Sequence, residues 1–163
     1  MSAFTPEPQI VYPEKEFEEA VVQEIKSLLA GEEHVLMRSF GLDVALFLKG
    51  DRQRLLEFKS FGGQRMGGVG FGNKAGEGPQ VDLLLQHESF LPLLDKGIRW
   101  VFANALLPRG EARFALLTTT EARLAAMGTI NRSKQNNFNI GRAFSSPLTW
   151  DALSAHLARF LVG

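Results

Sequence analysis

Three residues in the first half of the chain have the types and the spacing that phosphodiester hydrolysis requires. Asp43 opens the apolar run 44–48, and Glu57 and Lys59 lie two positions apart in the next run, 54–61. Because side chains alternate between the two faces of a strand, we expect Glu57 and Lys59 to project from the same face. Two carboxylates beside an ammonium group are able to hold Mg²⁺ or Mn²⁺ and to activate a water next to a phosphodiester.

A further carboxylate, Glu18, belongs to a segment with helical periodicity, 14–30. At about 100° per residue the apolar positions of this segment share one arc, and Glu18 falls within the arc whereas Glu19 falls on the polar side. A carboxylate on an apolar face needs a cation or hydrogen-bond donors. If the helix packs on the sheet, we expect Glu18 to reach the site that holds Asp43 and Glu57.

Each of these residues alone also has an ordinary structural interpretation. Charges at E-x-K spacing on a strand are usually a solvated pair, an Asp at a strand start usually belongs to a turn, and a Glu in the first turn of a helix often complements the helix dipole. Their order along the chain favours a shared site. A Glu on an apolar helix face is followed by an Asp before an apolar strand and by E-x-K in the next strand.

The surrounding pattern predicts a single α/β domain over residues 1–163. We expect a helix at 14–30, strands at 34–40, 43–49 and 54–61, a glycine-rich stretch at 62–78, a helix at 79–95, strands at 98–107 and 112–118, a helix at 119–127, a loop at 128–147 and a helix at 149–161. This order is typical of a central mixed sheet with helices on its faces. The core is expected at about 14–118, with the C-terminal loop and helix of 128–163 added to it.

The composition is that of an ordinary globular chain. Of 163 residues, 45% are apolar and 22% are charged, and the formal net charge is zero. The absence of cysteine excludes disulfides and thiolate metal sites, and the three scattered histidines lack the spacing of a zinc site. No signal-like or membrane-spanning pattern occurs, so we expect a cytoplasmic protein with no membrane partner.

The glycine-rich stretch lacks the spacing of a nucleotide-binding loop. Gly72 is followed by Asn73 and Lys74 rather than by the Lys-Ser/Thr of a P-loop, and Asn73 also replaces the third glycine of a dinucleotide fingerprint. We therefore expect no nucleotide cofactor. The loop could instead bring backbone N–H groups to a phosphate, with Arg65 and Lys74 adding charge, or it could be a surface loop without a ligand. The Asn- and Arg-rich stretch 128–146 suits nucleic-acid contacts and also a hydrogen-bonded structural loop, which is the interpretation we favour.

Glu18 on a first helix, Asp43 leading a strand and Glu57-Phe58-Lys59 on the next strand resemble the PD-(D/E)XK phosphodiesterases, the restriction-endonuclease-like superfamily. The resemblance covers roughly 14–105, and Leu42 stands in place of the proline of the name. It implies a restriction-endonuclease-like fold with an α-β-β-β-α-β core. It also implies a Mg²⁺- or Mn²⁺-dependent nuclease that hydrolyses DNA, and it allows a homodimer.

By position, the resemblance makes Asp43 and Glu57 metal ligands, Lys59 the catalytic lysine and Glu18 an auxiliary ligand. The backbone carbonyl of Phe58 is a further candidate ligand. Some members of the superfamily place a Gln or Lys on the following helix, so Gln80 joins Arg65 and Lys74 as a candidate nucleic-acid contact.

Because the superfamily includes members that have lost activity, the main alternative is a module of the same fold that binds DNA or a protein partner without turnover. The zero net charge favours this alternative slightly. If instead the resemblance is accidental, Glu57 and Lys59 should lie on an exposed face far from Asp43. DNA versus RNA, and endonuclease versus exonuclease, stay open.

Overall fold

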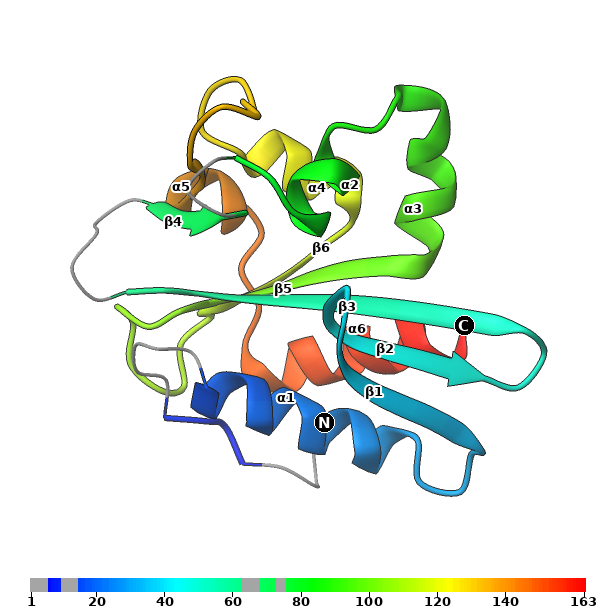
Figure 1. Ribbon diagram of the computed structural model, residues 1–163. Helices are drawn as coiled ribbons and strands as arrows, with labels where there is room; N and C mark the ends of the chain where they lie inside the picture. The colour runs from blue at the N-terminus through cyan, green and yellow to red at the C-terminus, as the bar shows by residue number, and fades with distance from the viewer. Residues whose placement is uncertain (1–5, 10–14, 63–67, 73–75) are drawn as a thin grey trace.

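In the computed structural model, which describes residues 6–9, 15–62, 68–72 and 76–163, the chain forms a five-stranded mixed sheet flanked by helices (Figure 1). The strand order is β1 (His34–Phe40), β2 (Leu42–Leu48), β3 (Arg52–Phe61), β5 (Ile98–Asn104) and β6 (Phe114–Leu117). Strands β3 and β5 are parallel, and all other neighbours in this sheet are antiparallel. The α/β architecture with a mixed, helix-flanked sheet, which the sequence predicts, is therefore confirmed.

Helices cover both faces of the sheet. On one face lie α1 (Lys15–Leu28) and α6 (Trp150–Val162), and on the other lie α2 (Pro79–Leu84), α3 (Leu91–Gly97), α4 (Thr119–Ala125) and α5 (Ile140–Ala143) (Figure 1). A short 3₁₀ helix, Glu88–Phe90, precedes α3, and a two-stranded sheet of β4 (Gly68–Phe71) and β7 (Asn136–Asn139) lies on the same side as α2. No helix in the described part of the chain is both long and apolar enough to cross a membrane.

An apolar cluster lies on each face of the sheet, between the sheet and the helices that cover it, and β3 contributes to both clusters. Its even-numbered side chains Leu56 and Phe58 pack with α1 and α6, whereas its odd-numbered Phe61 packs with the helices of the other face. The alternation follows from the period of two in a strand. Glu57 and Lys59 therefore share the face of Phe61, on the side of the sheet opposite to α1.

The helix expected at 79–95 is two helices. Helix α2 ends at Leu84, and α3 begins at Leu91 with Pro92 in its first turn. Proline is tolerated there because the first N–H groups of a helix have no intrahelical acceptor. The helix expected at 119–127 is α4, Thr119–Ala125, and Thr118 before it forms a capping box with Glu121.

The stretches expected to be loops contain short regular elements. Strand β4 lies within 62–78, while β7 and α5 lie within 128–147. Each of the two strands has four residues, and within the described residues each pairs with the other and with no further strand. Such pairing depends on tertiary context rather than on local pattern, which explains why the sequence did not indicate it.

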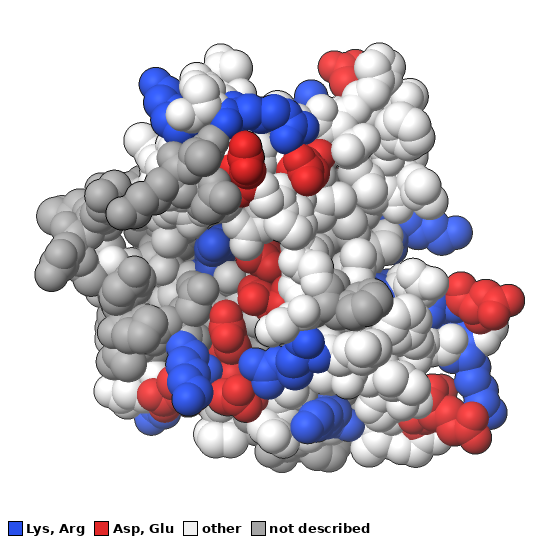
Figure 2. Space-filling view, viewed as in Figure 1, with Lys and Arg blue, Asp and Glu red and all other residues white. Residues whose placement is uncertain are grey.

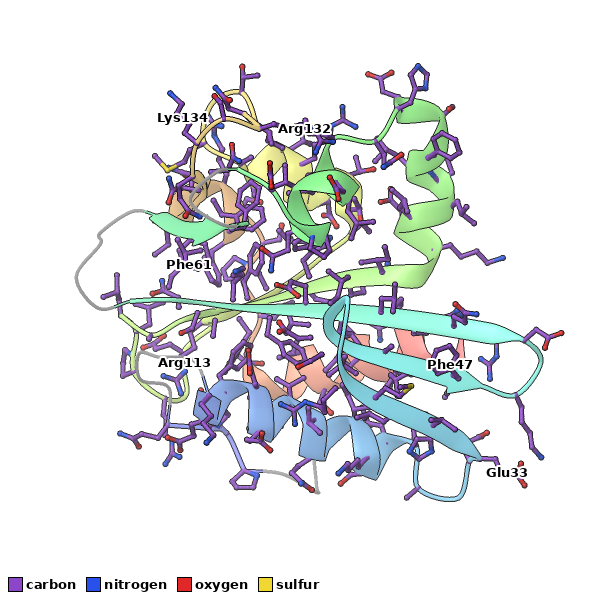
Figure 3. The ribbon with its side chains drawn as sticks, viewed as in Figure 1. Glu33, Phe47, Phe61, Arg113, Arg132 and Lys134 are labelled. Carbon is purple, nitrogen blue, oxygen red and sulfur yellow. The ribbon has the colours of Figure 1, made fainter. Side chains whose placement is uncertain are left out.

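The described N-terminal segment, residues 6–9, is held by one buried arginine. The guanidinium of Arg113 donates to Glu7 Oε1 (2.7 Å), to the Pro8 carbonyl (2.6 Å) and to the Leu107 carbonyl (3.0 Å). The N–H of Gly110 donates to the other carboxylate oxygen of Glu7 (2.9 Å). Figure 3 shows Arg113 below the sheet, on the side of α1.

The first apolar cluster generates a stability prediction. Phe17 is fully buried, with its ring centroid 6.1 Å from that of Phe58 and 6.0 Å from that of Phe114. We expect Phe17→Ala to lower the free energy of unfolding by about 3–5 kcal/mol, because truncation leaves a cavity. Phe90→Ala is the matched control, since Phe90 is 52% exposed and should lose less than about 1 kcal/mol. Chemical denaturation measures both, and equal losses would contradict this placement of the core.

Candidate functional site

Two carboxylates lie where the backbone pairing of β2 and β3 ends. The pairing runs to Val44 opposite Leu56, so Asp43 and Glu57 are the next residues in register. The Phe58 N–H donates to Asp43 Oδ2 (2.8 Å), and the Asp43 N–H donates to Glu57 Oε1 (3.1 Å). Each carboxylate thus accepts a hydrogen bond from a backbone N–H of the opposite strand. These N–H groups lie beyond the last backbone pair of β2 and β3, and the carboxylates provide their acceptors. Both side chains are fixed by the sheet itself.

Lys59 lies beside this pair. Its Nζ atom is 4.0 Å from Glu57 Oε2, and the side chains of Lys59 and Glu57 are only 14% and 4% exposed. The expected projection of Glu57 and Lys59 from one face of β3 is therefore confirmed. The accidental resemblance, which would place both residues on an exposed face far from Asp43, does not match this geometry.

Gln80 connects the carboxylates to the glycine-rich stretch. From the first turn of α2, its Nε2 donates to Glu57 Oε2, and its Oε1 accepts a hydrogen bond from the Gly72 N–H (2.7 Å). Gly72 has φ +75°, and a Cβ there would lie 2.6 Å from a methyl group of Val81, so only glycine fits. Gln80 does point back at the site, as the sequence indicated, and its contact there is Glu57. Contact of Gln80 with nucleic acid stays a prediction.

The surroundings of Glu57 disfavour its charge. Burial, the neighbouring charge of Asp43 and a hydrogen bond shared with the Asp43 carboxyl raise the pKa of Glu57 to about 9, against the opposing effect of Lys59. At neutral pH Glu57 therefore holds a proton unless more positive charge is brought to the pair. A bound cation is one source of that charge.

The donor set fits a cation that keeps part of its water shell. Mg²⁺ commonly takes one or two carboxylates and retains several waters, and Asp43 and Glu57 supply such oxygens. Among the described residues no three His, Asp or Glu side chains form a group that could hold a metal ion. Binding of Mg²⁺ or Mn²⁺ by Asp43 and Glu57 stays a prediction. The Phe58 carbonyl as a ligand stays a prediction.

Glu18 is half-buried on α1, and the buried side chains of this helix pack on the face opposite to Glu57 and Lys59. Its role as an auxiliary ligand stays a prediction. The fully buried acid of α1 is Glu24, which the sequence analysis did not select. Its Oε2 accepts a hydrogen bond from Ser154 Oγ on α6, and its Oε1 has no hydrogen-bond partner in the described part of the chain. Arg65 and Lys74 lie outside the described residues.

The face that carries the site has mixed charge. Figure 2 shows acidic side chains in a hollow near its centre, between α1 and α2, with basic side chains above and below. Two exposed arginines are already ion-paired, Arg38 with Glu19 (3.2 Å) and Arg132 with Asp82 (2.7 Å). Figure 3 shows Arg132 and Lys134 at the outer edge of the molecule.

Side-chain amides make hydrogen bonds within the Asn-rich stretch 128–146, which contains β7 and α5 and is not a loop throughout. Asn136 Nδ2 donates to the Asn131 carbonyl (2.8 Å), and the Asn131 N–H donates to Asn136 Oδ1 (2.7 Å). Gln135 Nε2 donates to the carbonyl of Phe71 (3.0 Å) and so links the loop to β4. These amides therefore serve the fold around the glycine-rich stretch.

The pKa of Glu57 generates a prediction about stability and pH. The pKa is about 9 in the folded protein and about 4.5 ordinarily, so between these values the folded state binds more protons than the unfolded state. The contribution of Glu57 to the free energy of unfolding should therefore be fully present below the lower value and be lost as the pH rises toward 9, by up to about 1.4 kcal/mol per pH unit. Glu57→Gln removes this titration, and denaturation at a series of pH values should show a flatter profile for the variant. Parallel profiles would contradict the raised pKa.

Comparisons of the chain with protein-family models, with curated proteins and with solved structures find no match. The chemistry assigned to the site therefore depends on its own residues. Those residues are two hydrogen-bonded carboxylates, a lysine held 4.0 Å from one of them and a glutamine that fixes the same carboxylate.

Proposed function

We propose that this protein is a divalent-cation-dependent nuclease of the PD-(D/E)XK type, which hydrolyses phosphodiester bonds of DNA. The convergence of Asp43, Glu57 and Lys59 carries this proposal, because it joins two hard-oxygen ligands to one ammonium group in a largely buried position. The order α1, β1, β2, β3, β4, α2, α3, β5 supports a restriction-endonuclease-like fold, since it contains the α-β-β-β-α-β core that the resemblance implies, with β4 and α3 as additions.

Asp43 and Glu57 would hold the cation, with the Phe58 carbonyl and Glu18 as additional candidates. When bound there, Mg²⁺ or Mn²⁺ supplies a water of lowered pKa and neutralises charge on the phosphodiester. Asp43 is oriented by the Phe58 N–H and Glu57 by the Asp43 N–H, so neither carboxylate needs to reorganise on binding. The hydrogen bond from Gln80 fixes the other oxygen of Glu57, which makes Gln80 a positioning residue.

Lys59 is the proposed catalytic lysine. At 4.0 Å its ammonium is too far from Glu57 Oε2 for a direct hydrogen bond, although its charge favours the ionised form of Glu57. Its N–H groups can therefore turn to a phosphate oxygen or to the attacking water. Stabilising charge that develops on a phosphate is the kind of contribution a preorganised, poorly solvated ammonium makes.

A second candidate is the same fold used without turnover, as a module that binds DNA or a protein partner. It is favoured by the lack of a three-acid group among the described residues and by the ion-paired state of Arg38 and Arg132. The two candidates differ in whether the parent protein cleaves DNA at all.

The first test substitutes the two charged groups separately. Asp43→Asn and Lys59→Met should each reduce DNA cleavage with Mg²⁺ or Mn²⁺ by about 100-fold or more, because one removes a ligand charge and the other the ammonium. Duplex, single-stranded and branched DNA are all assayed. Asp51→Asn and Lys49→Met are matched controls in the turn at the other end of the β2–β3 hairpin, and they should retain activity.

Absence of cleavage on every substrate, together with no Mn²⁺ binding by calorimetry, would overturn the nuclease proposal. Binding of DNA that persists in Asp43→Asn and Lys59→Met, with a parent that never cleaves, would establish the binding module instead.

The second test concerns Gln80. Gln80→Ala should weaken Mn²⁺ affinity, measured by calorimetry, by about 10-fold to 100-fold, because residues that orient a metal ligand contribute on that scale. Gln86→Ala is the control, since Gln86 is exposed and donates only to the Asp82 carbonyl nearby. Unchanged affinity in Gln80→Ala would show that Glu57 needs no such support.

A further inference from the structure

Arginines gather around one phenyl ring on the face of the sheet opposite to the carboxylates. The guanidinium carbon of Arg99 lies 4.5 Å from the ring centroid of Phe160, and that of Arg54 lies 5.5 Å from it. Arg159 is the neighbouring residue on α6. Arg54 comes from β3 and Arg99 from β5, on the side that packs against α1 and α6.

The partners of these arginines are mostly neutral carbonyls. Arg54 donates to the carbonyls of Phe160 (3.0 Å) and Gln53 (2.9 Å), and Arg99 Nη1 donates to the carbonyls of Ile98 (2.8 Å) and Asp95. Within the described part of the chain, no ion pair includes Arg54, Arg99 or Arg159. Burial lowers the pKa of both Arg54 and Arg99. Arg54 is buried, Arg99 is half-buried with the charges of Asp95 and Glu121 acting on it, and Arg159 is exposed. An anion placed here would meet guanidinium groups that form no ion pair in the described part of the chain.

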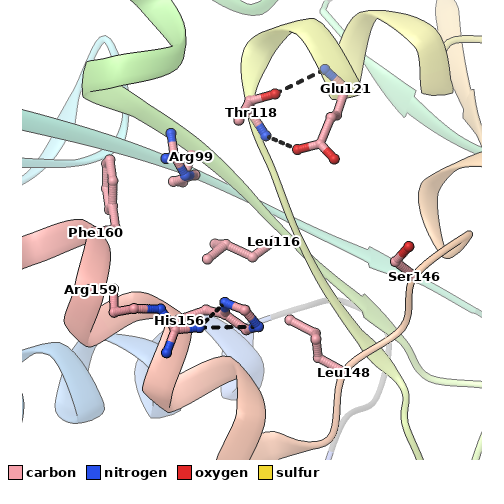
Figure 4. Close-up of a pocket in the computed structure, with 9 residues that line it drawn as sticks. All are labelled: Arg99, Leu116, Thr118, Glu121, Ser146, Leu148, His156, Arg159 and Phe160. Atoms are coloured by element: carbon pink, nitrogen blue, oxygen red, sulfur yellow. Dashed lines mark hydrogen bonds between the residues drawn. The ribbon is translucent and has the colours of Figure 1, made fainter. Parts of the chain in front are cut away.

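A pocket of about 400 Å³ opens beside this group (Figure 4). Arg99 lines it from β5, and His156 and Arg159 line it from α6, where the Arg159 guanidinium contacts the His156 ring. Figure 4 shows these side chains around one common space. The volume falls in the range of small-molecule sites.

The rest of the lining separates into an apolar floor and a polar rim. Leu116, Leu148 and the ring of Phe160 form the floor. At the rim, the carboxylate of Glu121 accepts a hydrogen bond from the Thr118 N–H (2.9 Å) and is thereby held at the start of α4. One carboxylate against the guanidinium groups of Arg99 and Arg159 leaves the lining net positive.

We propose that this pocket binds a small organic phosphate, with the phosphate group between Arg99 and Arg159 and the apolar body on Leu116 and Leu148. Guanidinium groups suit this ligand because their planar forks bind phosphate through paired hydrogen bonds. The concave shape favours a small molecule over a polymer backbone. The proposal is independent of nuclease activity, since neither Asp43 nor Glu57 lines the pocket.

Calorimetry with adenosine 5′-monophosphate, adenosine and inorganic phosphate tests the proposal. The monophosphate should bind, adenosine should not, and inorganic phosphate should bind more weakly than the monophosphate. Arg159→Ala should weaken binding of the monophosphate about tenfold or more, because it removes a charge-assisted contact. Arg38→Ala, an exposed arginine on the opposite edge strand β1, is the matched control and should bind as the parent does.

Because loss of Arg99 could unfold the protein, Glu121→Gln provides a second variant. Glutamine preserves the capping box with Thr118 while removing the negative charge, so affinity for the monophosphate should rise about threefold. Equal binding of adenosine and the monophosphate, equal binding of inorganic phosphate, unchanged affinity in Arg159→Ala, or no binding of any probe would each overturn the proposal.

Discussion

The reciprocal hydrogen bonds between Asp43 and the Glu57-Phe58 segment are the interaction on which the site depends. Where β2 and β3 stop pairing through their backbones, each carboxylate accepts an N–H of the other strand. The hairpin therefore fixes the distance between two acids that are far apart in sequence. It also places the buried Glu57 beside the half-buried Asp43, where burial and the charge of Asp43 disfavour a negative charge on Glu57.

The alternation of side chains along β3 separates the chemistry of the molecule into two faces. Glu57 and Lys59 project toward α2 and the small β4–β7 sheet, whereas Arg54, Leu56 and Phe58 project toward α1 and α6. An acidic site and an arginine-rich pocket can thus be built from one strand without neutralising each other. The sheet between them keeps opposite charges apart.

Local patterns predicted the parts of this structure that local physics controls. The alternation of side chains along a strand placed Glu57 and Lys59 on one face, and the strand expected at 34–40 has the bounds of β1. Contacts between distant segments could not be predicted in this way. The arginine cluster requires Phe160 from the last helix, and β4 exists because β7 pairs with it. The sequence did indicate that Glu24 lies on the same side of α1 as Phe17, because it follows Phe17 by seven residues. The burial of this side at Glu24 depends on α6, which the sequence did not place.

The raised pKa of Glu57 connects the geometry of the site to its chemistry. A proton and a divalent cation would compete for the same carboxylate oxygens, so cation affinity should fall as the pH is lowered. Lys59 cannot remove the competition, because its ammonium is 4.0 Å from Glu57 Oε2 and makes no direct hydrogen bond there. That distance has a consequence of its own. An ammonium that donated hydrogen bonds to Glu57 would have fewer N–H groups left for another acceptor. One held slightly apart keeps these N–H groups for an acceptor such as a phosphate oxygen. The same spacing that leaves Glu57 short of positive charge thus leaves the Lys59 ammonium without a direct hydrogen bond to Glu57.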